Sequence, residues 1–146
     1  MPVVYIIGIA LLVGVDQFVK HWVVVSLALG QSFTLIPGVI SLTRINNTGA
    51  AWSILAGHQE VFIIIALLAV VIIGYFLVHY WKNVPYRIGL SLLFAGTAGN
   101  VIDRILNGHV VDMFQLDFIN FPIFNCADMF LTFGIIILGI AILREQ

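Results

Sequence analysis

The sequence predicts an all-α membrane protein of four transmembrane helices, with a small extracytoplasmic β-ribbon, or cradle, after the first helix. Hydrophobic residues make up 62% of the chain and charged residues 9%, whereas soluble domains are about 45–50% apolar. The apolar residues gather in four long stretches, and a segment of alternating polar and apolar residues lies between the first two. With 146 residues, residues 1–146 are expected to form a single polytopic membrane domain.

Each apolar stretch is long enough for a membrane-spanning helix, which needs about 20 residues. The expected spans are residues 3–25, 61–80, 88–106 and 127–143. The second is the clearest, because Val61–Val78 contains no charged residue. The first span lacks the basic start and the cleavage site of a secretory signal peptide, so we expect it to be retained. The first and third spans contain polar or charged residues that must be shielded from lipid: Asp16, Lys20, Asn100, Asp103 and Arg104.

The placement of lysine and arginine predicts the orientation of the spans. Lys82 and Arg87 lie between the second and third spans, and Arg144 lies in the C-terminal tail. The connections on the opposite side hold only Arg44 outside the spans. Cytoplasmic loops are enriched in these residues, so both termini are expected in the cytoplasm and the two long connections on the outer face.

The first outer segment, residues 26–60, is expected to contain a β-ribbon rather than a helix. Polar and apolar residues alternate on both sides of Pro37–Gly38, a pair typical of a turn. A two-stranded ribbon is only marginally stable alone in water. We therefore expect residues 30–48 to rest on the membrane surface or against the ends of the spans.

Composition and spacing argue against several functions. The formal net charge of −1 does not suit nucleic-acid binding, which needs a concentrated basic surface. The single cysteine, Cys126, forms no internal disulfide. His109 precedes Asp112 by three residues and Asp128 is a further acid, but no second histidine stands at ligand spacing and no HExxH motif occurs. No metal site and no cofactor are therefore predicted.

The third span carries a polar stripe. On a helix, Gly96, Asn100 and Arg104 fall at i, i+4 and i+8, and Asp103 stands three residues after Asn100. One interpretation is helix packing, in which Gly96 allows close approach and Asn100 bonds to a neighbouring helix. The other is a functional site. The stripe by itself leaves both interpretations open.

Asp16 and Lys20 in the first span have the i, i+4 spacing of a helical ion pair, with the acid nearer the N-terminus, which is the favourable order. We interpret them as a pair that neutralises itself in the membrane and orients the first helix. The passage "NNTGAAW", residues 46–52, places the amide of Asn47 beside the low surface of Gly49. Such a surface suits an extended peptide, although an ordinary turn explains the pattern as well.

The second outer segment, residues 107–126, and the start of the fourth span supply two acids for chemistry. Asn125 precedes Asp128 by three residues and can cap the helix there, which explains how an acid is tolerated at that position. Capping does not explain Asp112, which is expected on the same face. Two neighbouring carboxyls do not both ionise easily, so one holds a proton while the other acts as a base, as an aspartic protease requires. Asp117 in the same segment is expected to be solvated.

Five short motifs follow one another along the chain: "DQFVK", "NTGAAWS", "GNVIDRI", "GHVVDMF" and "PIFNCAD". Together they resemble the ordered motif set of the bacterial lipoprotein signal peptidase family, also called signal peptidase II. Each motif is weak alone, but the five in order cover nearly the whole chain. The resemblance implies an aspartyl endopeptidase of the bacterial inner or plasma membrane. Such an enzyme removes signal peptides from prolipoproteins by cleaving before a cysteine that already carries diacylglyceryl.

Carried over by position, the resemblance makes Asp112 and Asp128 the catalytic pair, acting on a water that attacks the scissile carbonyl. It implies supporting or substrate-binding roles for Asp16, Lys20, Asn47, Gly49, Asn100, Arg104, Asn125 and Ala127. Trp52 stands where many members have phenylalanine, and Ala95 where many have the first glycine of a Gly-Gly pair. The implied partners are lipid-modified prolipoproteins and membrane lipids, and the chain is expected to act as a monomer.

Two other functions are open on the residues alone. A proton- or ion-coupled transporter would use a relay of acids, namely Asp16, Asp103, Asp112 and Asp128. A relay needs acids distributed through the membrane depth, whereas the last two of these are expected on one face. A non-enzymatic assembly subunit would bind partner helices through the polar stripe, but it leaves the two outer acids unexplained.

Overall fold

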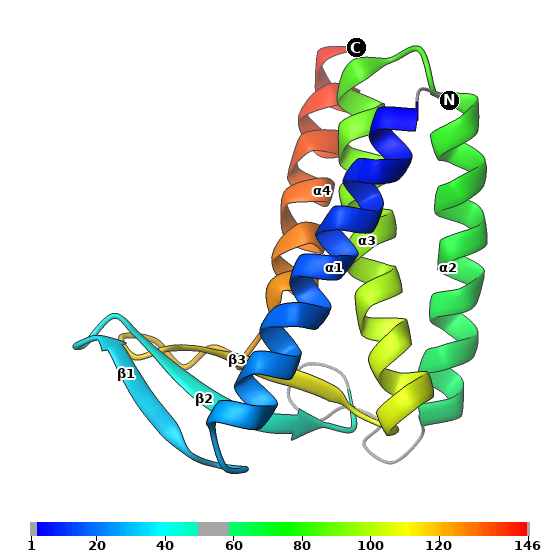
Figure 1. Ribbon diagram of the computed structural model, residues 1–146. Coiled ribbons are helices and arrows are strands. Elements are labelled where there is room, and N and C mark those ends of the chain that lie inside the picture. The colour runs from blue at the N-terminus through cyan, green and yellow to red at the C-terminus, as the bar shows by residue number, and fades with distance from the viewer. Residues whose placement is uncertain (1–2, 50–58, 146) are drawn as a thin grey trace.

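The computed structural model describes residues 3–49 and 59–145. Its helices run side by side, with both termini at one end of the bundle and a small sheet at the other (Figure 1). The helices are α1 (Val3–Ser26), α2 (Gln59–His79), α3 (Val84–Asn107) and α4 (Cys126–Arg144). Each helix overlaps one of the apolar stretches of the sequence. The part of the "NTGAAWS" motif from Ala50 to Ser53 lies outside the described residues.

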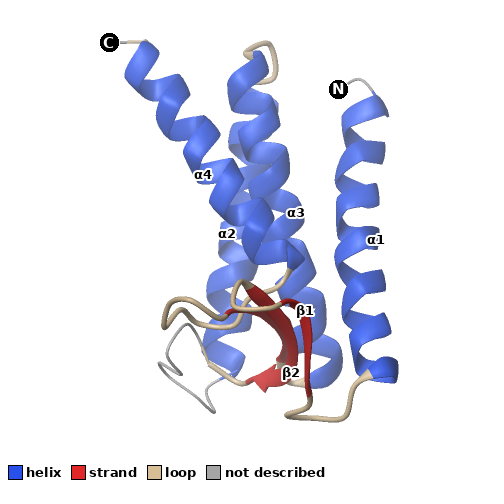
Figure 2. Cartoon of the chain, turned by 90° about the vertical axis from the view of Figure 1, so that its left-hand side faces the viewer, coloured by secondary structure: helices blue, strands red, loops and turns tan. Residues whose placement is uncertain are grey.

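Three helices in the described part of the chain are long and apolar enough to cross a membrane: α1, α2 from Glu60, and α4. The helix α3 is as long as α1, with 24 residues each, but it carries the polar stripe. It lies at the centre and contacts each of the other three helices (Figure 2). The acidic residue of α3, Asp103, is only 2% exposed. Ser91 and Asp103 of α3 are thus buried by protein, and Asn100 and Arg104 are partly buried.

Close approach of α3 and α4 depends on Gly96. A Cβ atom at this position would lie 2.5 Å from the carbonyl oxygen of Ala127 and 2.8 Å from Cγ of Leu131. Real Cβ atoms are not found so near a backbone oxygen, so the two helices would have to separate. The packing interpretation of the polar stripe therefore holds for its glycine.

A three-stranded antiparallel sheet, in the order β1-β2-β3, lies at the end of the bundle far from the termini. The strands are β1 (Ser32–Ile36), β2 (Ile40–Asn47) and β3 (Val110–Leu116). The expected hairpin turns at Gly38, which has a φ of 72°. The third strand was not predicted, because residues 110–113 are all buried and show no polar alternation. Asp112 consequently lies on a strand rather than in a loop.

The sheet packs on the end of α1. Val23 of α1 forms a buried cluster with Leu42, Val111 and Met113 of the sheet. Nη1 of Arg44 on β2 donates hydrogen bonds of 2.8 Å to the carbonyl oxygens of Val24 and Leu27. These bonds satisfy carbonyls that the end of a helix leaves without partners. Arg44, counted in the sequence only as an outer positive charge, therefore ties the sheet to α1.

The chain between β3 and α4 is folded back onto the sheet. The backbone N–H groups of Met113 and Phe114 donate to the carbonyl oxygen of Phe124, at 3.0 and 2.8 Å, and the N–H of Phe124 donates to Phe114 at 3.1 Å. These bonds place the residue after Phe124, the N-cap of α4, beside β3. The two segments that carry Asp112 and Asp128 thereby meet.

Candidate active site

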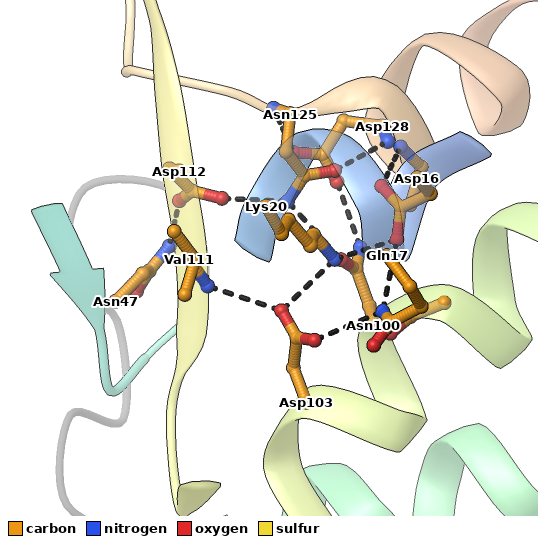
Figure 3. Close-up of polar contacts among 12 residues, drawn as sticks. Asp16, Gln17, Lys20, Asn47, Asn100, Asp103, Val111, Asp112, Asn125 and Asp128 are labelled. Atoms are coloured by element: carbon orange, nitrogen blue, oxygen red, sulfur yellow. Dashed lines mark hydrogen bonds and ion pairs between the residues drawn. The ribbon is translucent and has the colours of Figure 1, made fainter. Parts of the chain in front are cut away.

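Asp112 on β3 and Asp128 in the first turn of α4 are linked by one residue, Asn125, through its side chain and its backbone (Figure 3). Nδ2 of Asn125 donates to Oδ1 of Asp112 at 2.6 Å. The backbone N–H of Asn125 donates to Oδ2 of Asp128 at 3.1 Å. Asn125 is 0% exposed and Asp112 is 2% exposed. A single buried residue thus brings the two predicted catalytic acids to one site.

The other oxygen of each acid also accepts a hydrogen bond from an asparagine. Nδ2 of Asn47 donates to Oδ2 of Asp112 at 2.9 Å, and Nδ2 of Asn100 donates to Oδ1 of Asp128 at 2.9 Å. Asn47 pairs with Val110 across the β2–β3 ladder, so its side chain reaches the acid two residues further along the same face. All four carboxylate oxygens are held by N–H donors, which favour the charged form.

Burial nevertheless raises the pKa of Asp112 from 3.8 to about 6. Desolvation is the largest cause, and the negative charge of Asp128 adds to it, while the hydrogen bonds from Asn47 and Asn125 act in the opposite direction. An acid that titrates near neutral pH is suited to give and take a proton at physiological pH.

Asp128 also takes part in a capping box at the start of α4. Oδ1 of Asn125 accepts from the backbone N–H of Asp128 at 3.0 Å, while the Asp128 carboxylate accepts from the backbone of Asn125. The cap predicted at Asn125 is therefore present. A carboxylate in the first turn also lies at the positive end of the helix dipole.

The expected ion pair of Asp16 and Lys20 forms, at 2.9 Å. The pair belongs to a larger group than the sequence predicts, because Nζ of Lys20 also lies 3.0 Å from Oδ2 of Asp103. One lysine thus serves two acids, and its third donor reaches Oδ1 of Asn100 at 3.0 Å. Asp16 in turn accepts from the backbone N–H of Ala127 at 2.8 Å. The first helix therefore holds Asn100 of α3 and the backbone of Ala127 on α4, next to Asp128.

Arg104 and Gly49 lie on the other side of the pair. Nη2 of Arg104 donates to the carbonyl oxygen of Gly49 at 3.2 Å, and its guanidinium carbon lies 5.0 Å from the centre of the Phe62 ring on α2. The backbone N–H of Gly49 donates to Oδ1 of Asn47 at 2.9 Å, which orients the Asn47 amide toward Asp112. Arg104 therefore contacts two other parts of the site, the segment after β2 and the helix α2.

A cavity of about 650 Å³ has both acids in its wall. Four further predicted site residues line it: Asn47, Gly49, Asn100 and Arg104. Apolar residues of several segments also line it, among them Ala66 of α2, Val110 of β3, Phe121 and Phe124 before α4, and Met129 and Phe133 of α4. The remaining predicted residues, Asp16, Lys20, Asn125 and Ala127, are buried behind the wall. The site thus combines a pair of acids with a cavity wall that is mostly apolar.

Sequence reasoning missed two members of this network. Nε2 of Gln17 donates to Oδ1 of Asp103 at 3.0 Å and to the carbonyl oxygen of Gly99 at 3.2 Å. Gln17 stands inside the "DQFVK" motif, so the signal was its place beside Asp16. Asp103, considered only within the polar stripe and the relay, accepts from the backbone of Val111 at 3.1 Å. Both are partners of atoms that lie far away in the sequence.

Asp117, the third outer acid, is exposed and does not line the cavity. Its Oδ2 accepts a hydrogen bond from Oγ of Ser41 at 2.8 Å, and its backbone N–H donates to Val39 at 3.0 Å. Asp117 therefore attaches the chain after β3 to β2, apart from the catalytic candidates.

The chain matches the signal peptidase II family over residues 8–144. The lipoprotein signal peptidase of Latilactobacillus sakei is 51% identical, over 97% of this chain and 93% of the relative. That of Lactiplantibacillus plantarum is 49% identical, over 98% of this chain and 96% of the relative. A solved bacterial membrane enzyme superposes with a TM-score of 0.94 at 37% identity, over 99% of this chain and 90% of that one. The chain therefore belongs to the signal peptidase II family.

Proposed function

We propose that this chain is a membrane aspartyl endopeptidase that removes signal peptides from diacylglyceryl-modified prolipoproteins, with Asp112 and Asp128 as its catalytic pair. Membership of the signal peptidase II family supports the reaction, and cleavage before the lipidated cysteine follows from it. The observation that carries the assignment of the pair is the bridge through Asn125, which holds the two acids together in the wall of one cavity.

The reaction needs one charged and one protonated carboxyl. The charged acid takes a proton from a water, which attacks the scissile carbonyl carbon, and the protonated acid donates to the developing oxyanion or to the leaving amine. Each positioned group of this kind accelerates a reaction by about 10²–10⁴-fold. Burial raises the pKa of Asp112 to about 6, which suits this residue to hold the proton before the reaction begins.

The groups around the pair are suited to hold an extended substrate. Asn47, Gly49 and Arg104 line the same cavity as the acids and come from different elements. Arg104 keeps further N–H donors beyond the one that reaches Gly49, and these can engage substrate carbonyl oxygens. The apolar wall formed by α2 and α4 accommodates the hydrophobic signal peptide and the lipid.

We further propose that α3 is the fourth membrane span and that the termini face the cytoplasm. The helix is as long as α1 and is surrounded by the three apolar helices. At the end that bears the termini, the guanidinium of Arg87 lies 4.2 Å from the ring centre of Tyr5 and 4.9 Å from that of Trp81. Aromatic residues mark a membrane–water interface, and the bias of lysine and arginine toward this end marks it as the cytoplasmic one. The acids then lie near the outer face.

A single copy of the chain supplies both acids and all the hydrogen-bond partners described for them. A monomer is therefore sufficient for the proposed reaction. The transporter alternative needs acids distributed through the membrane depth. It is not supported, because the four acids of its relay are connected within one cluster. Lys20 joins Asp16 to Asp103, and Asn100 and Asn125 continue the network to Asp112 and Asp128 (Figure 3).

The test is cleavage of a purified lipidated prolipoprotein by the purified protein in detergent. Asp112→Asn and Asp128→Asn are each expected to lower kcat by at least about 10³-fold, since each removes one proton-transfer group. Asp117→Asn serves as the matched control and is expected to keep wild-type kcat, because Asp117 lies outside the cavity.

Three outcomes would contradict the proposal. Wild-type activity in either active-site variant would exclude that acid from the pair. Equal cleavage of precursor without diacylglyceryl would remove the substrate assignment. Proton flux into liposomes without any cleavage would favour the transporter.

A further inference from the structure

The residues that precede the two proposed catalytic acids are held in the same way. The backbone N–H of Val111, next to Asp112, donates to Oδ2 of Asp103 at 3.1 Å. The backbone N–H of Ala127, next to Asp128, donates to Oδ1 of Asp16 at 2.8 Å. A strand and a helix are thus each fixed, one residue before the acid, by a second carboxylate.

The carboxylates of Asp16 and Asp103 are in turn held by the same two side chains, Lys20 and Gln17. Nζ of Lys20 lies 2.9 Å from Asp16 and 3.0 Å from Asp103. Nε2 of Gln17 donates to both acids, at 3.2 and 3.0 Å. Asp16 is 0% exposed, Lys20 3% and Asp103 2%. In Figure 3, Lys20 lies between Asp16 and Asp103.

Hydrogen bonds to charged groups are shorter and stronger than those between neutral groups. Every carboxylate oxygen of Asp16 and Asp103 accepts at least one hydrogen bond, from the ammonium group of Lys20, the side-chain amide of Gln17 or a backbone N–H. Buried charges are costly unless they are paired and fully hydrogen-bonded, and this group meets both conditions. The group contacts both chain segments of the site, and none of its members lines the cavity.

We propose that Asp103 and Asp16 are positioning residues, each acting through a backbone N–H to set the location of one catalytic acid, with Lys20 fixing the distance between them. This inference rests on the proposed function of Asp112 and Asp128. Misplacement of a catalytic group by about 1 Å costs on the order of 10²-fold in rate. By holding the backbone N–H groups next to Asp112 and Asp128, these residues therefore control the rate without touching substrate.

The test uses Asp103→Asn and Asp16→Asn in the full-length protein, with the lipidated prolipoprotein as substrate. Either change leaves Lys20 paired with the other acid, so no buried charge loses its last partner. We expect kcat to fall about 10²-fold while KM changes less than about twofold. The acidic limb of the pH profile of kcat should also shift in Asp103→Asn, because Asp112 moves relative to the donors Asn47 and Asn125.

Gly99→Ala is a second test that keeps every charge. A Cβ at Gly99 would lie 2.5 Å from Oδ2 of Asp16, so the alanine displaces this carboxylate and is expected to lower kcat selectively as well. Ser41→Ala is the control, since Ser41 is 5% exposed and hydrogen-bonded but contacts neither proposed catalytic acid. Its kcat should stay within about twofold of wild type.

The outcomes separate this inference from the function on which it rests. If the Asp103→Asn and Gly99→Ala proteins, measured as folded monodisperse fractions, keep wild-type kcat and pH profile, the positioning role is wrong. The same holds if they change KM alone. Loss of folded protein with unchanged activity per folded molecule would show a structural role only. If Asp112→Asn remains active, the proposed function fails, and the inference fails with it.

Discussion

At Asp112 two environments compete. The protein covers the carboxyl almost completely, which favours the protonated form, whereas the amides of Asn47 and Asn125 favour the carboxylate. Burial is the larger effect, so the pKa rises to about 6. A buried acid with a raised pKa is a feature that clusters at functional sites, which is consistent with the catalytic role proposed for Asp112.

The raised pKa of Asp112 predicts a pH dependence of stability. Between pH 3.8 and about 6 the folded protein binds more protons at this residue than the unfolded chain does. The free energy of unfolding therefore falls as pH rises through this window, by on the order of 3 kcal/mol. Asp112→Asn lacks this dependence.

Thermal unfolding in detergent at pH 4 and pH 7 measures the effect. Wild type should lose stability relative to Asp112→Asn on going from pH 4 to pH 7. Asp117→Asn is the control, and its difference from wild type should stay nearly constant because Asp117 is exposed. Parallel curves for wild type and Asp112→Asn would contradict the assignment of the buried acid.

The candidate residues could be predicted from the sequence because polar groups stand out in an apolar chain. Asp112, Asp128 and Asn125 are conspicuous for this reason. The role of Asp103 could not be predicted, since its partner is the backbone N–H of Val111. A backbone donor has no identity in the sequence, and only the fold shows which acceptor it meets.

At the level of elements, helices were easier to predict than strands. The apolar stretches lead directly to the helices, because a span in lipid must satisfy its backbone internally. The hairpin was visible from its alternation around Gly38. The strand β3 was not, because it is covered by α1 on one side and lies in the site on the other. The strand that carries Asp112 is thus the one whose sequence does not alternate between polar and apolar residues.

The α3–α4 contact predicts different results for two glycines. Gly96→Ala is expected to destabilise the protein by about 1–3 kcal/mol, because overpacked contacts cost this much and the new Cβ meets the Ala127 carbonyl. Gly14→Ala on α1 is the matched control, since nothing lies within 4 Å of its Cβ position. It is expected to be neutral or slightly stabilising.

Thermal unfolding of both variants in the same detergent tests this contrast. Gly96→Ala should also reduce kcat, because Ala127 precedes Asp128 in the chain. Equal midpoints for the two alanine variants would show that α3 and α4 can separate without cost.

For the whole molecule, the sheet and the termini lie at opposite ends of the bundle (Figure 1). The proposed orientation predicts that a cysteine at Asn120, an exposed position after β3, reacts with a membrane-impermeant thiol reagent in intact spheroplasts. A cysteine at Lys82, between α2 and α3, should react only after permeabilisation. Both are made in a Cys126→Ala background, since Cys126 is the single native cysteine. The reverse labelling pattern would invert the topology.

The cavity has a consequence for how substrate arrives. Its wall includes Ala66 of α2 together with Met129 and Phe133 of α4, two helices that pack on α3 rather than chiefly on each other. Phe133 is 56% exposed, and an exposed apolar side chain on a membrane-spanning helix meets lipid, so we expect this side of the cavity to face the bilayer. Exposing a lipid chain to water costs about 0.8 kcal/mol per CH₂ group, so extracting a diacyl chain would require well over about 10 kcal/mol. A substrate that diffuses sideways within the membrane plane avoids this barrier, and its search for the enzyme is two-dimensional.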